Sequence, residues 1–217
     1  RAERLYNAVP FATILFMLNL GMGFATLFAV LWLMTRPTRR TLRGSMLMKI
    51  AVAVMLLSFA ALTLCVALRW LIRGTAPMAN GYETMLLMAW IIMTASLLLC
   101  RRFAIVLTFG FIMSGFFLLV SHISQMDPQI THIMPVLQSP LLSIHVSVIM
   151  MAFALLSLTF ICGITALLLR AMRGSRAEGL AAQLAALRAL SQLFYYPAMA
   201  ALAVGIFVGA VWANRSW

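Results

Sequence analysis

The stretch LMKIAVAVMLLSFAALTLCVALRW, residues 47–70, is apolar almost throughout and carries charges only near its two ends. A helix needs about 20 mainly apolar residues to cross a hydrocarbon core of about 30 Å, and this stretch meets that length. Hydrophobic residues make up 65% of the 217-residue chain and charged residues 9%, against roughly 45–50% and 25% in soluble domains. The sequence therefore predicts an all-α, polytopic membrane protein.

Six membrane spans are expected in one helical membrane domain over residues 1–217. The spans cover about residues 10–34, 47–70, 81–99, 103–121, 140–169 and 192–213. Residues 122–139 are expected to form the one long polar outer loop. Residues 173–190 are Ala-rich with a leucine stripe, which predicts an amphipathic helix on the inner membrane face. The alternative is that this segment extends the fifth span into the cytoplasm.

The net charge of +12 is distributed between the spans. Eleven of the 16 Lys and Arg residues fall in three connections, over 36–49, 101–102 and 170–188, and the two intervening connections hold few or none. This alternation follows the positive-inside rule, so both chain ends are expected on the outer side. The positive charge thus reflects how the chain is oriented across a lipid membrane. It does not indicate a nucleic-acid partner.

The segment Asn80-Gly81-Tyr82-Glu83 opens the third expected span. Asn80 with Glu83 three residues later is typical of a capping box, with the carboxylate near the positive end of the helix. A role in shaping a site is equally open, because a carboxylate at membrane depth is costly unless it has a partner.

The preceding span ends in Arg69, Trp70 and Arg73, which predict an interfacial anchor with snorkelling cations.

His145 lies in the second expected turn of the fifth span, after Ser139 as N-cap and Pro140 as first helical residue. It is near the outer surface but among apolar neighbours. A neutral imidazole there suits haem iron as an axial ligand. A structural hydrogen bond is the competing interpretation.

Other residues give weaker signals. His122 and His132 are expected to be solvated in the outer loop, and their spacing from His145 matches no zinc pattern. A Ser114 nucleophile with His145 as its base would need an oxyanion hole, and no Gly-rich donor loop is evident. The three cysteines, Cys65, Cys100 and Cys162, have no C-x-x-C pair and are interpreted as core residues.

Two stretches together resemble one family, and the closing segment resembles a third part of it. MANGYETMLLMAW, residues 78–90, resembles the outer-loop-to-helix segment of CcsA/ResC-type cytochrome c maturation proteins, with its Asn, Tyr-Glu pair and downstream Trp. MPVLQSPLLSIHVSVIMMAFALL, residues 134–156, resembles the family's entry into a helix that begins with a histidine. GIFVGAVWANRSW, residues 205–217, resembles the approach to the Trp-rich WWD loop, which would follow Trp217.

The resemblance implies a haem-handling protein of the bacterial inner membrane that presents haem b on the periplasmic side. It also implies covalent attachment of haem to apocytochrome c at a C-x-x-C-H motif, as a cytochrome c haem lyase with a CcsB/ResB-type partner, fused or separate. His145 would be the outer axial ligand of the iron. Tyr82, Glu83 and Asn80 would support the site, and Trp217 would start the Trp-rich segment.

Two other functions stay open. A haem exporter or small-molecule transporter without an attachment step would show the same helices. A dihaem electron carrier would need paired histidines deep in facing spans, and this chain has one histidine in a span.

Overall fold

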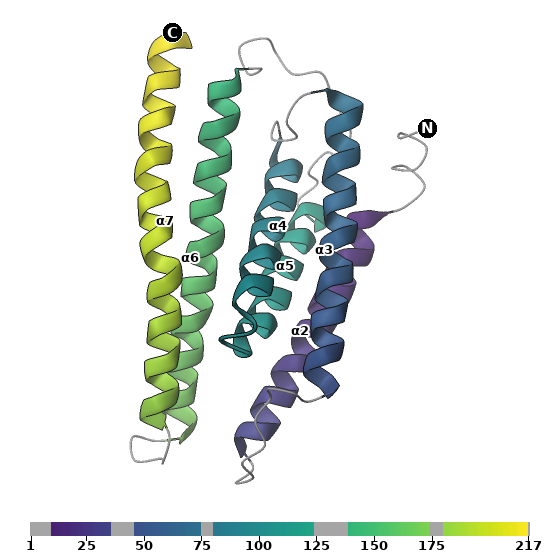
Figure 1. Ribbon diagram of the computed structural model, residues 1–217, viewed down its shortest axis with the longest axis vertical. Helices are drawn as coiled ribbons and strands as arrows, with labels where there is room; N and C mark the ends of the chain where they lie inside the picture. The colour runs from purple at the N-terminus through teal and green to yellow at the C-terminus, as the bar shows by residue number, and fades with distance from the viewer. Residues whose placement is uncertain (1–9, 36–45, 75–79, 124–138, 174–179, 217) are drawn as a thin grey trace. The chain divides into compact units, whose positions relative to one another are not determined.

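The computed structural model describes residues 10–35, 46–74, 80–123, 139–173 and 180–216. These residues form helices and short turns, with no strand among them. The helices are α2 (Phe11–Thr35), α3 (Met46–Arg73), α4 (Gly81–Leu99), α5 (Ile105–Ile123), α6 (Pro140–Arg173) and α7 (Leu180–Ser216) (Figure 1). All six are long and apolar enough to cross a membrane, which confirms the predicted all-α membrane fold.

The predicted spans agree closely with the helices. The third span has the predicted bounds, and the fifth begins at Pro140 as expected. The turn between α4 and α5 is short: the backbone N–H groups of Arg102 and Phe103 both donate to the carbonyl of Leu99. The two helices therefore form a tight hairpin, whereas the placement of both chain ends on the outer side stays a prediction.

The predicted helix over 173–190 differs from the structure. Residues 180–190 are the first turns of α7, which continues unbroken to Ser216 and holds Pro197 in its interior. The leucine stripe that suggested a separate helix is instead part of one face of α7, with Leu180, Leu187 and Leu190 buried. Residues 174–179 lie outside the described residues.

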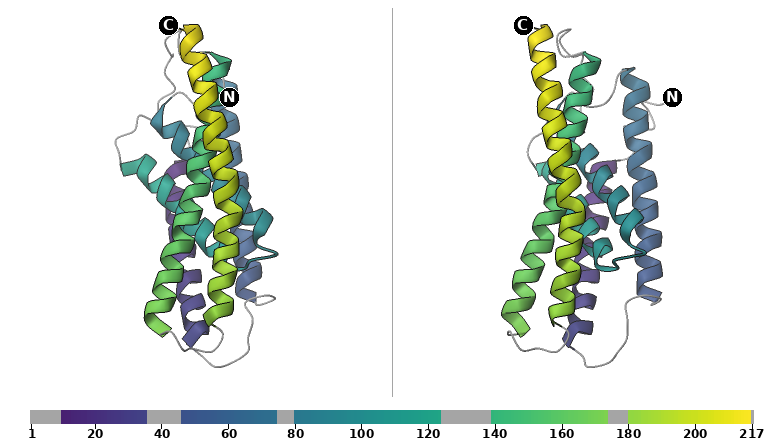
Figure 2. Two further views of the ribbon diagram at one scale, coloured as in Figure 1. Left: turned by 90° about the vertical axis from the view of Figure 1, so that its left-hand side faces the viewer. Right: turned by 60° about the vertical axis from the view of Figure 1, so that its left-hand side comes forward.

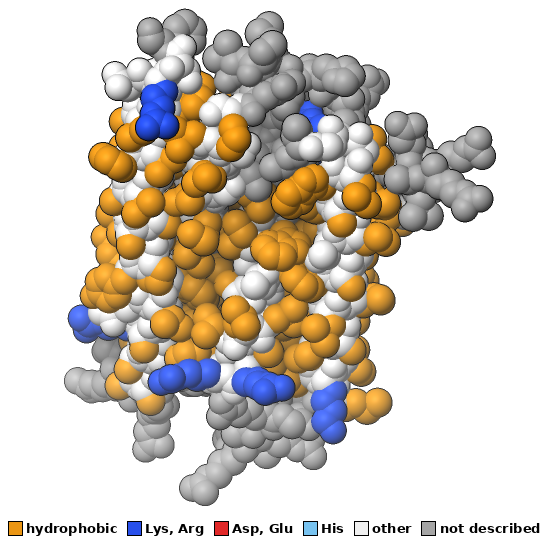
Figure 3. Space-filling model, turned by 45° about the horizontal axis from the view of Figure 1, so that its top comes forward, with side chains coloured by type: hydrophobic (Ala, Val, Ile, Leu, Met, Phe, Trp, Pro, Cys, Tyr) orange, Lys and Arg blue, Asp and Glu red, His pale blue; other side chains and the backbone are white. Residues whose placement is uncertain are grey.

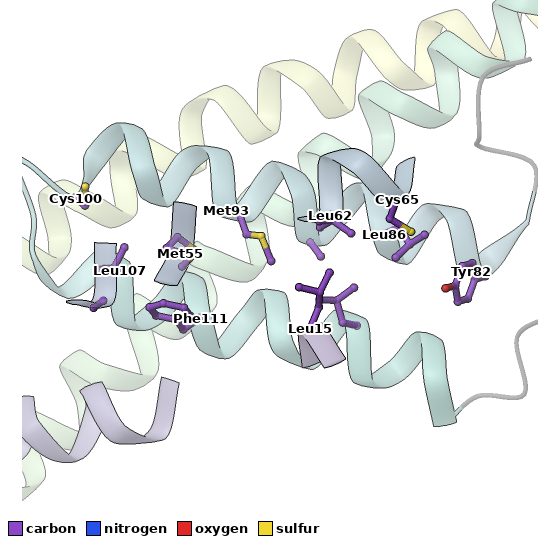
Figure 4. Packing of buried hydrophobic residues seen from close by; sticks show 13 residues of the cluster. Leu15, Met55, Leu62, Cys65, Tyr82, Leu86, Met93, Cys100, Leu107 and Phe111 are labelled. Atoms are coloured by element: carbon purple, nitrogen blue, oxygen red, sulfur yellow. The ribbon is translucent and has the colours of Figure 1, made fainter. Parts of the chain in front are cut away.

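The chain divides by its contacts into two compact units, unit 1 (Arg1–Ser143) and unit 2 (Ile144–Trp217). In unit 1, α5 packs against α2, α3 and α4, and α3 also contacts α2 and α4. Buried apolar side chains from all four helices form its core, among them Leu15, Leu62, Leu86 and Phe111 (Figure 4). All three cysteines are free and buried, as predicted.

Unit 2 consists of α6 and α7, which run side by side in opposite directions (Figures 1 and 2). Gly205 packs against Ile149, and Gly209 packs against His145. Since the residue number rises on one helix as it falls on the other, these contacts confirm the antiparallel register. The pair places the start of α6 beside the end of α7.

Apolar side chains cover the middle of the helices, while Lys and Arg side chains lie near their ends (Figure 3). This distribution is the one that lipid demands, because charged groups reach water or headgroups only at the two interfaces.

Close packing of α5 on α2 depends on Gly115. A Cβ at this position would lie 2.9 Å from the backbone nitrogen of Leu20. Backbone atoms in a helix cannot move aside as the end of a flexible side chain can, so only glycine allows this approach. Small residues commonly serve this purpose between helices in membranes.

We predict that Gly115→Ala lowers the free energy of unfolding by about 1–2 kcal/mol, because the overlap with α2 outweighs the gain in helix propensity. Gly21→Ala is the matched control, since a Cβ there would meet nothing within 4 Å. Thermal unfolding in detergent measures both, and equal midpoints for the two variants would contradict the packing argument.

Candidate functional site

His145 is placed by the start of α6. Pro140 is the first residue of the helix, and the N–H of Ser143 donates to the carbonyl of Ser139 at 3.2 Å, which closes the first turn. Proline suits this position because its missing N–H has no role in a first turn. His145 follows about 7–8 Å along the helix axis, where its side chain is half-buried.

The imidazole of His145 is held by α7. Its Nδ1 lies 2.7 Å from the carbonyl oxygen of Gly205. A carbonyl can only accept, so Nδ1 carries the proton and donates, which leaves Nε2 as the acceptor nitrogen of the neutral ring. Histidines that bind metals commonly have this arrangement, in which a backbone carbonyl fixes the tautomer and the ring orientation.

Gly209 provides the space that the ring occupies. A Cβ on Gly209 would lie 2.5 Å from Cε1 and 2.7 Å from Nδ1 of His145. Gly205 and Gly209 are one helical turn apart, so one face of α7 supplies both the carbonyl that orients the ring and the gap that admits it. The ring is therefore oriented before any ligand binds.

A second polar cluster joins the end of α3 to the start of α4 in unit 1. Nε and Nη2 of Arg69 donate to Oε1 of Glu83 at 3.1 and 2.9 Å, and Nη1 of Arg73 donates to Oε2 at 2.5 Å. The Arg69 and Glu83 side chains are 0% and 1% exposed. Arg69 therefore does not snorkel as predicted but is a buried ion-pair partner.

The predicted capping of α4 is present. The side-chain oxygen of Asn80 accepts from the N–H of Glu83 at 2.9 Å, and Asn80 itself has extended backbone. The Glu83 carboxylate meets Arg69 and Arg73. The Arg69 guanidinium also lies over the Tyr82 ring, 4.9 Å from its centroid. The structure thus brings Asn80, Tyr82 and Glu83 together near Arg69. The sequence alone predicts no contact between Arg69 and these residues.

Burial makes this cluster sensitive to the loss of one partner. We predict that Glu83→Gln lowers the free energy of unfolding by about 3–5 kcal/mol, because Arg69 would keep its charge at a buried position without the carboxylate. Unfolding in detergent measures the change.

The double variant Arg69→Met with Glu83→Met tests whether an unpaired buried charge causes this loss of stability. Since it removes Arg69 together with its carboxylate and leaves only Arg73 without the Glu83 carboxylate, it should recover part of the stability that Glu83→Gln loses. A double variant less stable than Glu83→Gln would show that the cluster acts through something other than charge pairing.

The other sequence candidates have ordinary surroundings. His122 lies in the last turn of α5, exposed, with its ring centroid 5.3 Å from that of Phe16. The Ser114 hydroxyl donates to the carbonyl of Phe111 in its own helix. No group of three or more metal-ligating side chains occurs among the described residues. His132 and Trp217 lie outside the described residues.

A family model described as "Cytochrome C assembly protein" matches residues 78–217, well over half of the chain. The chain belongs to the cytochrome c assembly protein family. The match includes the stretches 78–90, 134–156 and 205–217 that carry the resemblance, and membership confirms the predicted role in cytochrome c maturation at the level of the family.

Two curated relatives are similar to the chain. Protein NrfI of Wolinella succinogenes is 31% identical over 220 residues, which cover 100% of this chain and 24% of NrfI. "Cytochrome c biogenesis protein CcsA" of Chlamydomonas reinhardtii is 29% identical over 167 residues, which cover 72% of this chain and 46% of that protein. The chain therefore spans about a quarter of the length of NrfI and about half of the length of the Chlamydomonas protein.

Proposed function

We propose that this chain presents haem b at the outer face of the bacterial inner membrane, within a protein that joins haem covalently to apocytochrome c. The observation that supports it best is the hydrogen bond between His145 Nδ1 and the Gly205 carbonyl. That bond leaves Nε2 as a neutral, oriented nitrogen donor at the end of a membrane helix, which is the chemistry that haem iron selects in an axial ligand.

The residues around His145 fit such a ligand. The carbonyl of Gly205 raises the basicity of the ring and keeps it from rotating, and Gly209 keeps the space for it open. A half-buried position limits access of water while leaving the ring reachable. His145 would therefore hold haem, the substrate, from one side of the iron.

Haem supplies the reactive vinyl groups, and the two thiols of the C-x-x-C-H motif in apocytochrome c add to them. The chain's contribution is orientation of the substrate, which lowers the entropic part of the barrier. The lyase activity, the apocytochrome substrate and a CcsB/ResB-type partner belong to this proposal for the whole protein.

Asn80, Tyr82 and Glu83 are proposed as supporting residues. Glu83 bonds two guanidinium groups and Asn80 caps the helix, so both are engaged in holding α3 to α4. Their part would be to keep the outer end of this helix pair rigid, and not to react.

A haem exporter without an attachment step remains the second candidate, because it would use the same ligand. Formation of a covalent haem–thioether product by the full-length protein distinguishes the two functions.

We predict that the full-length protein purified from membranes contains six-coordinate haem and that His145→Ala loses haem or becomes five-coordinate. Visible absorption spectra of the oxidised and reduced protein measure this. His122→Ala is the matched control, since it removes an imidazole that packs against Phe16, and its spectrum should match wild type. Equal spectra for wild type and His145→Ala would reject the ligand assignment.

Gly209→Ala tests the orientation of the ring. Its methyl group would overlap the imidazole, so we expect at least a tenfold loss of haem affinity with the histidine still present. Gly163→Ala, on α6, would meet nothing within 4 Å and should bind haem as wild type does. The proposed role of Gly209 fails if a haem titration gives the two variants equal affinities.

A further inference from the structure

An apolar cavity of about 270 Å³ lies between α3 and α4 in unit 1. From α3 it is lined by Thr63, Val66, Ala67 and Trp70, which are spaced i, i+3, i+4 and i+7. From α4 the lining residues have the same spacing, from Glu83 through Leu86 and Leu87 to Trp90. Two such stripes make a straight groove about 10 Å long, parallel to the helices; we call it the α3–α4 groove.

The two ends of the groove differ in chemistry. At one end the indole N–H of Trp90 donates to Thr63 Oγ1 at 2.9 Å, and Phe59 stacks on Trp90 with ring centroids 5.5 Å apart. At the other end lie the buried Arg69–Glu83 pair and Trp70, which is 55% exposed. The groove therefore has an aromatic end at Trp90 and an opposite end with a buried guanidinium and an exposed tryptophan.

These features select the ligand class. Ala67 and Trp70 are exposed on a helix that is long and apolar enough to cross a membrane, so within unit 1 the groove opens on the outer side of the helix pair. Its volume lies below the range of about 300–1,000 Å³ that encloses a drug-sized molecule, and no His, Cys or Met occurs among its described lining residues. A whole porphyrin is thereby disfavoured, while a single linear hydrocarbon chain fits.

We propose that the α3–α4 groove binds one acyl chain of a phospholipid from the leaflet in which α3 ends and α4 begins. The upper part of the acyl chain lies along the two stripes and passes Trp90, and the rest of the chain continues toward the middle of the bilayer. The phosphate lies beyond the end marked by Trp70, since this exposed tryptophan favours the headgroup level. Residues of unit 1 alone line this groove, and the proposal does not depend on haem binding.

The test uses the full-length protein in lipid nanodiscs that contain a phospholipid with a diazirine on one acyl chain. After illumination, mass spectrometry locates the labelled residues. Wild type should be labelled mainly on the groove residues of α3 and α4. Ala67→Phe, which fills the groove, should reduce that labelling at least fivefold.

Ala53→Phe is the matched control, because Ala53 is an exposed alanine of α3 that does not line the groove; its labelling should equal wild type. If Ala67→Phe fails to fold, Ala67→Leu replaces it. The proposal is overturned if label spreads evenly over exposed helix faces, if Ala67→Phe is labelled like wild type, or if the groove residues stay unlabelled because protein covers them.

Discussion

In a hydrocarbon environment a polar group without a protein partner costs several kcal/mol, and this constraint governs nearly every polar contact in the chain. Hydroxyl groups of serine and threonine donate to carbonyls of their own helices, as Thr94 and Ser96 do. Several polar side chains join two helices instead: Ser58 donates to Asn19 from α3 to α2, and Arg69 bonds Glu83 from α3 to α4. His145 does the same between α6 and α7. Polar pairing therefore fixes which helix faces meet.

The same constraint bears on the proposed role of His145 as a haem ligand. The Gly205 carbonyl accepts from the Nδ1–H of the ring, which leaves Nε2 for the proposed ligand. The close approach that this bond requires is possible only because α7 carries glycine at 205 and 209, where Cβ atoms would overlap Ile149 and His145. Helix packing and ligand orientation thus depend on the same two residues.

Sequence predicted the helices well because span length and apolarity are properties of a single segment. Asn80 marked the start of α4 and Pro140 the start of α6, and both hold in the structure. The separate helix over 173–190 was wrong because a leucine stripe has the same period whether a helix lies on a membrane or continues into a span. Pairings between helices were harder to predict. Nothing in the spacing of Arg69 and Arg73 shows that Arg69 faces inward, and the His145–Gly205 bond joins residues 60 positions apart.

The most direct test of the account is chemical replacement of the proposed ligand. The full-length protein carrying His145→Gly would be purified with haem, and its visible and electron paramagnetic resonance spectra recorded with and without added ¹⁵N-imidazole. The account predicts that the variant loses the wild-type six-coordinate spectrum and that imidazole restores it, with a ¹⁵N coupling at the iron. A wild-type spectrum without imidazole, or no recovery with it, would contradict the assignment of His145 as the haem ligand.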